Sequence, residues 1–281
     1  MLTQLEAYSS WESAPTLPLS DNGREETDLI QVRNITGLDP VKGAINTSPF
    51  GSVDGVAFTG ATVPTGRNIV LTLHPNPDWN TWSYEGLRRL IYSYFMPKLL
   101  TRLLFRSNDI PPVEIYGYVE DVSVTQFSQD VEIQVSIICP DPYFTAVDAT
   151  VVTDKSSDGT NPLDIQYNGS VEAGINVEVL RFSDPGPTYI AIQVGEQVVS
   201  YFRVAATVDA TKYFIMNSLS GSKYVRNVTW NTGIITNLLP NLQQGSQWPT
   251  MKPGVNDFSV ITDTPGNQEF RLTYFERYGG L

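Results

Sequence analysis

Cysteine and histidine are almost absent: each occurs once in 281 residues, and this scarcity excludes several classes of protein. Because Cys139 has no second cysteine to pair with, the chain can form no internal disulfide and no cluster of thiolate metal ligands. The largely apolar residues 135–138 before it are typical of a thiol that serves as a small core residue. His74 stands beside Pro75 with no serine or cysteine nucleophile motif nearby, so we expect it to be an ordinary strand-end residue.

Motifs that carry chemistry are also missing. The sequence has no G-x-S-x-G nucleophile elbow, no G-K-[ST] phosphate loop and no H-E-x-x-H zinc helix. Glu114, Glu120 and Asp121 are candidate carboxylates for glycoside hydrolysis, but the sequence does not place any pair across a cleft. Residues 154–159 begin like a calcium loop, yet Ile165 stands where the bidentate glutamate belongs. We therefore expect no enzyme, with no catalytic residue, no cofactor and no metal.

Positive charge is scarce as well, with 18 Lys and Arg against 30 Asp and Glu and a net charge of -12. The basic stretch from Arg88 to Arg106 is interrupted by apolar residues, whereas nucleic-acid binding needs concentrated positive charge. The apolar run at residues 99–104 contains Arg102 and is too short to cross a bilayer, and residues 1–4 do not begin like a secretory signal. We expect no direct nucleic-acid recognition, no membrane insertion and synthesis in a reducing cytoplasm.

The residues that are abundant favour β-structure. Val, Ile, Thr, Tyr and Phe recur between Gly, Pro, Asn and Asp, which is the pattern of short strands joined by turns. The length exceeds what one hydrophobic core usually holds, which predicts two domains. We predict an irregular N-terminal arm over residues 1–28, a first domain over 29–150, a linker over 151–162 and an antiparallel β-sandwich over 163–281.

One helix and one long hairpin stand out in the first domain. An apolar stripe at helical spacing is formed by Leu87, Leu90, Ile91 and Tyr94. Ser83 can cap the start of this helix, and Pro97 ends it. A hairpin follows, with arms at residues 113–127 and 131–137, the second of which alternates apolar and polar side chains. The chain is thus predicted to be mainly β with one helix.

Taken in order, several segments resemble the siphophage distal tail protein family. In the first half the likeness is carried by residues 49–58, 66–73, 87–90, 116–120 and 138–144, which contain G-x-x-x-G, G-R-x-I and C-x-D-P-Y-F patterns. In the second half it is carried, more loosely, by residues 167–173, 248–258 and 270–278. The likeness begins near residue 30, and the residues before it depart from the family.

The resemblance implies a structural protein of the phage tail tip, located in the virion and made in the host cytoplasm. The first domain would be a β-barrel or sheet that forms the belt of a hexameric ring, and the second a galectin-like β-sandwich outside it. The ring would join the tail tube protein to the tail hub, and the tape measure protein would pass through it during assembly. A galectin-like fold does not by itself imply sugar binding, because function depends on sites.

The long hairpin is where we expect subunits of such a ring to meet. Strand edges must be covered, and pairing between neighbours in a closed ring is one way to cover them. The predicted subunit interface consists of Val113, Ile115, Tyr116, Tyr118, Val131, Ile133 and Val135.

The sequence leaves other functions open. Trp230 and Trp248 would suit a carbohydrate-binding module for receptor recognition, because aromatic rings stack on sugar faces. A tail-tip glycosidase is a second alternative, and a hub or wedge subunit in the baseplate of a contractile tail is a third.

Overall fold

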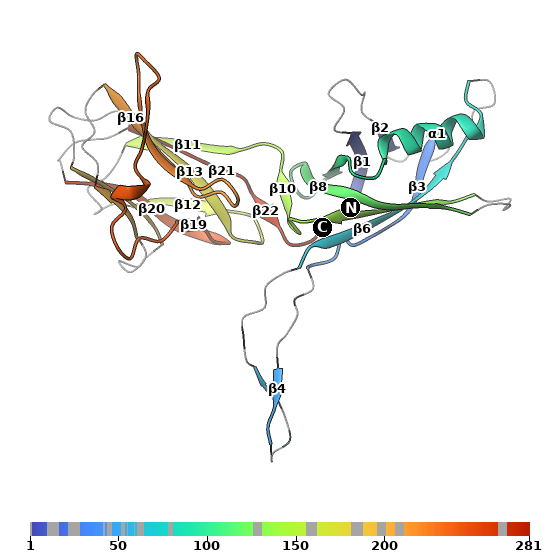
Figure 1. The fold of residues 1–281 in the computed structure, drawn as a ribbon, viewed down its shortest axis with the longest axis horizontal. Helices are drawn as coiled ribbons and strands as arrows, with labels where there is room; N and C mark the ends of the chain where they lie inside the picture. The colour runs from blue at the N-terminus through green and yellow to red at the C-terminus, as the bar shows by residue number, and fades with distance from the viewer. Residues whose placement is uncertain are drawn as a thin grey trace. The chain divides into compact units, whose positions relative to one another are not determined.

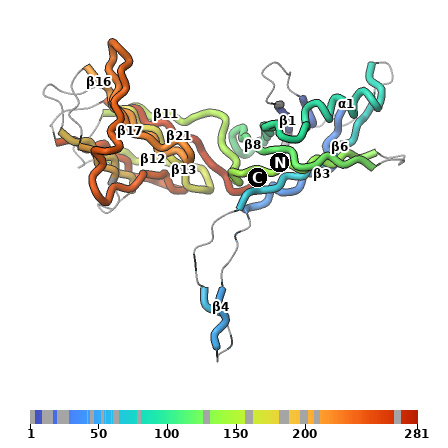
Figure 2. The backbone as a smooth tube through the Cα atoms, in the orientation of Figure 1, coloured from blue at the N-terminus to red at the C-terminus, as the bar shows by residue number. Residues whose placement is uncertain are grey.

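The computed structural model describes residues 2–9, 17–21, 29–41, 43, 47–51, 54, 56–58, 60, 65–77, 81–125, 131–155, 162–180, 188–195, 201–205, 211–263 and 269–281. The chain divides into two compact units. The first comprises Met1–Val147 together with Tyr278–Leu281, and the second comprises Asp148–Arg277. Figures 1 and 2 trace the chain through both units.

A curled antiparallel sheet forms the first unit. Along its main path the strands follow the order β2-β1-β7-β8-β9-β6-β3, and β10 adds to β8. The strands are β1 (Leu2–Ser9), β2 (Leu17–Asp21), β3 (Ile30–Thr36), β6 (Arg67–Pro75), β7 (Leu100–Ser107), β8 (Val113–Val124), β9 (Ile133–Cys139), β10 (Phe144–Ala146) and β22 (Arg277–Tyr278). The end strands β2 and β3 lie next to each other, so the sheet forms a nearly closed barrel.

Alternating side chains fill this barrel. Its centre is built from the fully buried side chains of Ile69, Leu71, Leu73, Ile133, Val135 and Ile137, on the neighbouring strands β6 and β9. The rings of Phe105 and Phe144 meet edge to face, with their centroids 5.6 Å apart. The same alternation turns polar side chains outward, as the sequence pattern predicts.

The predicted helix is α1 (Tyr84–Tyr94). Its N-cap is Ser83, whose Oγ accepts a hydrogen bond from the backbone N–H of Gly86 at 3.2 Å. It buries Leu87, Ile91 and Tyr94, and it ends before Pro97. The expected cap, apolar stripe and stop signal are therefore all confirmed.

Two short strands stand apart from the main sheet in the pairing pattern. β4 (Thr47–Pro49) and β5 (Val56–Phe58) pair with each other and form a separate two-stranded sheet. We call this pair the β4–β5 ribbon.

Arg67, the first residue of β6, joins separate stretches of the first unit. Its guanidinium N–H groups donate to the carbonyl oxygens of Pro142 (2.7 Å), Gly37 (2.6 Å), Asp39 (3.0 Å) and Gly279. The residue is only 6% exposed, and burial lowers the pKa of its guanidinium. The backbone N–H of Leu281 also donates to the carbonyl of Leu38, at 3.0 Å. These bonds assign residues 278–281 to the first unit, so the predicted boundary of 163–281 for the second domain is wrong at its end.

Two antiparallel sheets with a common core form the second unit, which is the predicted sandwich. One sheet follows the order β11-β21-β13-β16-β17-β18, with β19 on β13, and the other follows β12-β20-β14-β15. The first sheet contains β11 (Thr150–Lys155), β13 (Ala173–Val179), β16 (Lys212–Asn217), β17 (Tyr224–Thr229), β18 (Ile235–Asn237), β19 (Thr250–Met251) and β21 (Glu269–Tyr274). The second contains β12 (Leu163–Tyr167), β14 (Tyr189–Val194), β15 (Tyr201–Ala205) and β20 (Gly254–Thr262), and the 3-10 turn η1 (Leu239–Asn241) lies outside both.

Two further boundaries differ from the prediction. Within the supposed irregular arm, residues 1–28, β1 pairs with β7 and β2, and the core takes up Leu5, Ala7, Leu17 and Leu19. Within the supposed linker, residues 151–162, β11 pairs with β21 over six residue pairs. Both segments are rich in polar and turn-forming residues, and only their pairing partners elsewhere in the chain make them strands. Residues 10–16, 22–28 and 156–161 lie outside the described part.

Candidate functional site: the outer face of the barrel

Charged and aromatic side chains of β1, β7 and β8 form a connected network on the outer face of the barrel. The Nε of Arg102 lies 2.5 Å from Oε2 of Glu114, which also accepts a hydrogen bond from the Tyr116 hydroxyl at 3.3 Å through its other oxygen. The guanidinium of Arg102 covers the Tyr8 ring, 4.8 Å from its centroid. Burial, followed by the charge of Glu114, raises the pKa of Tyr116, so its hydroxyl stays a donor at neutral pH. Because the network already holds these side chains in place, they would lose less conformational entropy on binding a partner.

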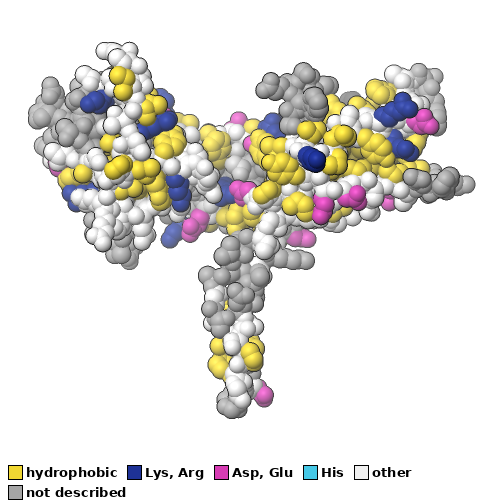
Figure 3. All heavy atoms as spheres, in the orientation of Figure 1, with side chains coloured by type: hydrophobic (Ala, Val, Ile, Leu, Met, Phe, Trp, Pro, Cys, Tyr) yellow, Lys and Arg dark blue, Asp and Glu magenta, His cyan; other side chains and the backbone are white. Residues whose placement is uncertain are grey.

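An apolar row lies beside this network. Cross-strand register places Leu100 of β7 opposite Tyr118 of β8, and Tyr118 opposite Ile138 of β9. The three side chains point outward and are 37%, 48% and 37% exposed, respectively. We call this row the β7–β9 stripe. Figure 3 shows hydrophobic side chains exposed among charged ones on this unit.

The predicted interface divides between the two faces of the sheet. Val113, Ile115, Ile133 and Val135 are 2% exposed or less and belong to the core of their own unit, so the prediction is wrong for these four side chains. Tyr116 and Tyr118 point outward, and Val131 is half-buried. The edge argument also fails, because β8 and β9 lie in the interior of the sheet with strands on both sides. A subunit contact here would use the outer face and not an edge.

The sequence pattern does not reveal Leu100 and Ile138 as neighbours. They lie 38 positions apart in the chain, and only the register through Tyr118 brings them together. No local pattern signals such a row.

Structural partners are present for three of the residues considered for catalysis, namely His74, Glu114 and Glu120. His74 is half-buried, with its Nδ1 3.1 Å from the carbonyl oxygen of Val131. Burial raises the pKa of the Cys139 thiol to about 12, which keeps it protonated. Glu114 is bound to Arg102, and Glu120 accepts a hydrogen bond from the Ser136 hydroxyl at 2.9 Å. Within the described ranges, no three His, Cys, Asp or Glu side chains are grouped to hold a metal ion.

The two tryptophans proposed for sugar contact differ in exposure. Trp230 is 51% exposed and packs on the Tyr213 ring at a centroid distance of 4.5 Å. Trp248 is half-buried, lies 4.8 Å from the Phe202 ring and packs against the sandwich core. Only Trp230 therefore offers a free ring face to a ligand.

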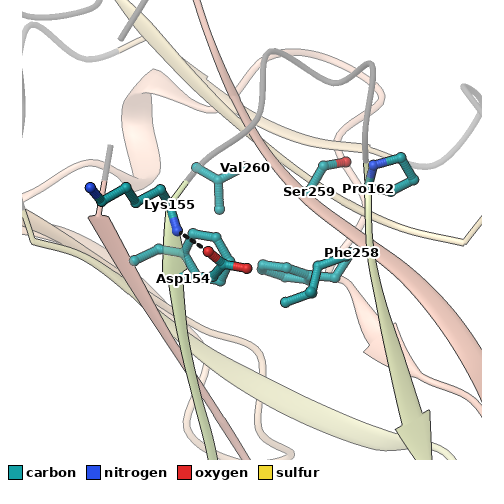
Figure 4. A pocket seen from close by; sticks show the side chains of 8 residues that line it. Asp154, Lys155, Pro162, Phe258, Ser259 and Val260 are labelled. Carbon is teal, nitrogen blue, oxygen red and sulfur yellow. Dashed lines mark hydrogen bonds between the residues drawn. The ribbon is translucent and has the colours of Figure 1, made fainter. Parts of the chain in front are cut away.

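A small pocket opens in the second unit, and Figure 4 shows its lining. Its volume is about 180 Å³, and Phe258, Val260 and Phe270 line its apolar part beside Asp154 and Lys155. The Asp154 carboxylate accepts a hydrogen bond from the backbone N–H of Lys155 at 2.7 Å. The pocket is smaller than ordinary small-molecule sites and contains neither tryptophan.

Among the described helices, none has the length and apolar character needed to cross a membrane.

Solved phage proteins have the fold of this chain. SPP1 Dit (gp 19.1), described as a paradigm of the hub adsorption apparatus in phages that infect Gram-positive bacteria, matches with a TM-score of 0.68 and 15% identity, over 97% of this chain and 98% of that chain. A chain of the phage P2 baseplate, in its activated conformation with Ca, matches with a TM-score of 0.50 and 10% identity over 100% of both chains. No family model matches the sequence, and no curated protein does. The resemblance stated from the sequence is thus confirmed at the level of the fold.

Proposed function

We propose that this chain is a distal tail protein, a structural component of a bacteriophage tail tip with no enzymatic activity. The carrying observation is the fold, which follows SPP1 Dit over almost the whole of both chains. In this role the protein resides at the distal end of the tail in the virion, after synthesis in the host cytoplasm. It forms a ring, hexameric as in the family it resembles, that joins the tail tube protein to the hub.

Features of the outer face of the barrel support the proposal that the chain assembles into a ring. It combines tyrosine and arginine side chains, which are enriched in protein interfaces, with the exposed apolar β7–β9 stripe. Closed rings arise when one surface of a subunit binds a different surface of its neighbour. The negative net charge suits a ring near the path of the DNA, because it repels the polyanion that moves past. The tape measure protein would pass through the same opening during assembly.

The native mass of the purified chain tests this proposal. Light scattering combined with negative-stain images should show a closed ring of about six subunits with a central hole. Tyr118→Glu should convert the ring to monomers without changing the far-ultraviolet circular dichroism, because the side chain is already half exposed. Val255→Glu is the matched control, since Val255 is 66% exposed but lies in the second unit. A chain that stays monomeric at high concentration contradicts the ring.

A carbohydrate-binding role for the second unit is the alternative that one observation favours. The free face of Trp230 is a suitable stacking platform for a sugar ring. A glycan array with the full chain should then give saturable binding that Trp230→Ala abolishes. Binding that Trp230→Ala leaves unchanged rules out this platform.

A further inference from the structure

The strands β16, β17 and β18 of the second unit lie in a part of the chain with an unusual charge. Residues 211–256 contain four positive side chains and neither aspartate nor glutamate, in a chain whose net charge is -12. The four are Lys212, Lys223, Arg226 and Lys252. Across the sheet, register places Glu178 of β13 two strands from Arg226, and Arg271 binds this carboxylate at 3.4 Å. This region is therefore positive, although the chain as a whole is negative.

Register shows which side chains share the outer side of these strands. β16 directs Phe214 and Met216 into the sandwich core, so Tyr213 between its neighbours points outward. Its cross-strand partner on β17 is Val228, and Arg226 lies two positions earlier on the same side of the sheet. We call this outer side the β16–β18 face, and the side chains that define it are Tyr213, Tyr224, Arg226, Ile235 and Asn237.

An aromatic platform lies at one end of the β16–β18 face. The backbone N–H of Trp230 donates to the carbonyl oxygen of Thr211 at 2.9 Å, which fixes the turn after β17. The Trp230 ring packs on Tyr213 with a centroid distance of 4.5 Å and is 51% exposed. A ring that is already held in place loses little entropy when a ligand stacks on it.

A cation without an anionic partner lies on the same face. The guanidinium of Arg226 lies over the Tyr224 ring, 4.2 Å from its centroid. Its Nε is buried with no hydrogen-bond acceptor, and none of the ion pairs among the described residues includes it. Arg102 and Arg271, by contrast, each bind a carboxylate. A guanidinium with unused donors is suited to a carboxylate or phosphate group of a ligand.

The spacing of these groups requires an extended ligand. Tyr213 and Arg226 lie one strand apart and about 7 Å from each other along the strands. A single cation on the face is too little for a nucleic acid, whose binding needs concentrated positive charge. A membrane surface is also a poor fit. Ile234 and Ile235 are exposed, but as successive residues they lie on opposite sides of the hairpin and form no joint apolar tip.

We propose that the β16–β18 face binds an acidic polysaccharide. One sugar ring of the polymer stacks on Trp230, and a carboxylate or phosphate group farther along the polymer pairs with Arg226. The inference rests on the carbohydrate-binding alternative and deepens it, because it adds a second contact and gives the ligand a charge. It does not depend on the ring, which is assigned to the first unit.

Affinity electrophoresis of the full-length chain tests this binding. The chain runs through gels that contain polygalacturonate as a carboxylate polymer, yeast phosphomannan as a phosphate polymer, or the methyl ester of polygalacturonate as the neutral match of the first. We expect at least one acidic polymer to slow the chain, and the neutral ester to bind at least about tenfold more weakly. The two acidic gels also distinguish which anion Arg226 recognises.

Substitutions assign the binding to the face. Arg226→Gln and Trp230→Ala should each weaken it at least about tenfold, whereas Trp230→Phe should retain most of it because a ring remains. Arg203→Gln is the matched control. Arg203 also lies over a tyrosine ring, that of Tyr189 at 3.8 Å, and its Nε is also buried without an acceptor, but it belongs to β15 in the other sheet. Unchanged melting temperatures and unchanged native masses exclude misfolding or loss of assembly as the cause.

The outcomes separate this inference from the proposals above. If neither acidic polymer slows the chain, the inference is overturned, and rings seen by light scattering still support the tail-tip role. Equal binding of polygalacturonate and its ester overturns the role of Arg226 and leaves the sugar platform of Trp230 standing. A loss with Arg203→Gln as large as that with Arg226→Gln also overturns the assignment. Tighter binding to single-stranded DNA or to phosphatidylglycerol vesicles than to either polysaccharide shows a different partner and overturns the proposal.

Discussion

Replacing Arg67 with methionine should destabilise the first unit more than any exposed substitution. The change keeps an unbranched apolar stem and removes the guanidinium, which donates to four carbonyl oxygens. Hydrogen bonds to a charged group contribute about 1.5–3 kcal/mol each, so simple addition would give roughly 6–12 kcal/mol. Addition overestimates the loss, because methionine also avoids the cost of burying the charge and the carbonyls share one donor group. We expect the free energy of unfolding to fall by about 3–5 kcal/mol.

Calorimetry on the full chain measures this loss. For a unit of this size, 1 kcal/mol shifts the melting temperature by roughly 2–4 °C, so the first unit should melt about 6–20 °C earlier. The transition of the second unit should stay in place, since Arg67 and its four acceptors all belong to the first unit. Arg67→Lys should restore only part of the loss, because an ammonium group lacks the planar fork that reaches several carbonyls at once.

The matched control is Arg106→Met. Arg106 is 42% exposed at its side chain, and its Nε lies 3.8 Å from Oε1 of Glu6, so its removal should cost less than about 1 kcal/mol. If Arg67→Met and Arg106→Met melt within 2 °C of each other, the reasoning from buried carbonyl partners is refuted.

Further predictions concern the core and the helix. Gly117→Ala should lower the free energy of unfolding, measured in urea, by about 1–3 kcal/mol, because the new Cβ would lie 2.6 Å from Cγ2 of Ile137. Gly51→Ala is the control and should leave the stability nearly unchanged, because its Cβ would meet no neighbour. The raised pKa of Cys139 favours the folded state below pH 9, and this contribution is lost between pH 9 and about 12. Cys139→Ala should therefore flatten the alkaline fall in stability by up to about 1.4 kcal/mol per pH unit, and an equal slope in both proteins would exclude this origin. Ser83→Ala should cost about 1 kcal/mol through loss of the N-cap, and an unchanged melting temperature would show that the cap is dispensable.

Local signals predicted the helix and the long hairpin correctly. α1 carries its own cap, apolar stripe and stop within fifteen residues, from Ser83 to Pro97, so no distant partner is needed to recognise it. The strand β1 has no such signal, and its identity depends on pairing with β7, about one hundred residues away. Arg67 is a still harder case, because its four acceptors lie 28 to 212 positions away in the chain.

The candidate interface is another case in which a local sequence pattern does not reveal which residues lie side by side. Alternation in the hairpin indicates that its two faces differ, but not which face meets solvent or which strands lie beside it. The apolar members of the predicted interface, Val113, Ile115, Ile133 and Val135, are buried in the core of their own unit. The two tyrosines of the same strand point outward and are the members that a partner can reach.

The return of residues 278–281 to the first unit makes the second unit an insertion within the first. During synthesis, residues 148–277 leave the ribosome before the segment that carries Gly279 and its bond to Arg67. The sandwich can therefore fold before the first unit acquires the bond between Arg67 and Gly279.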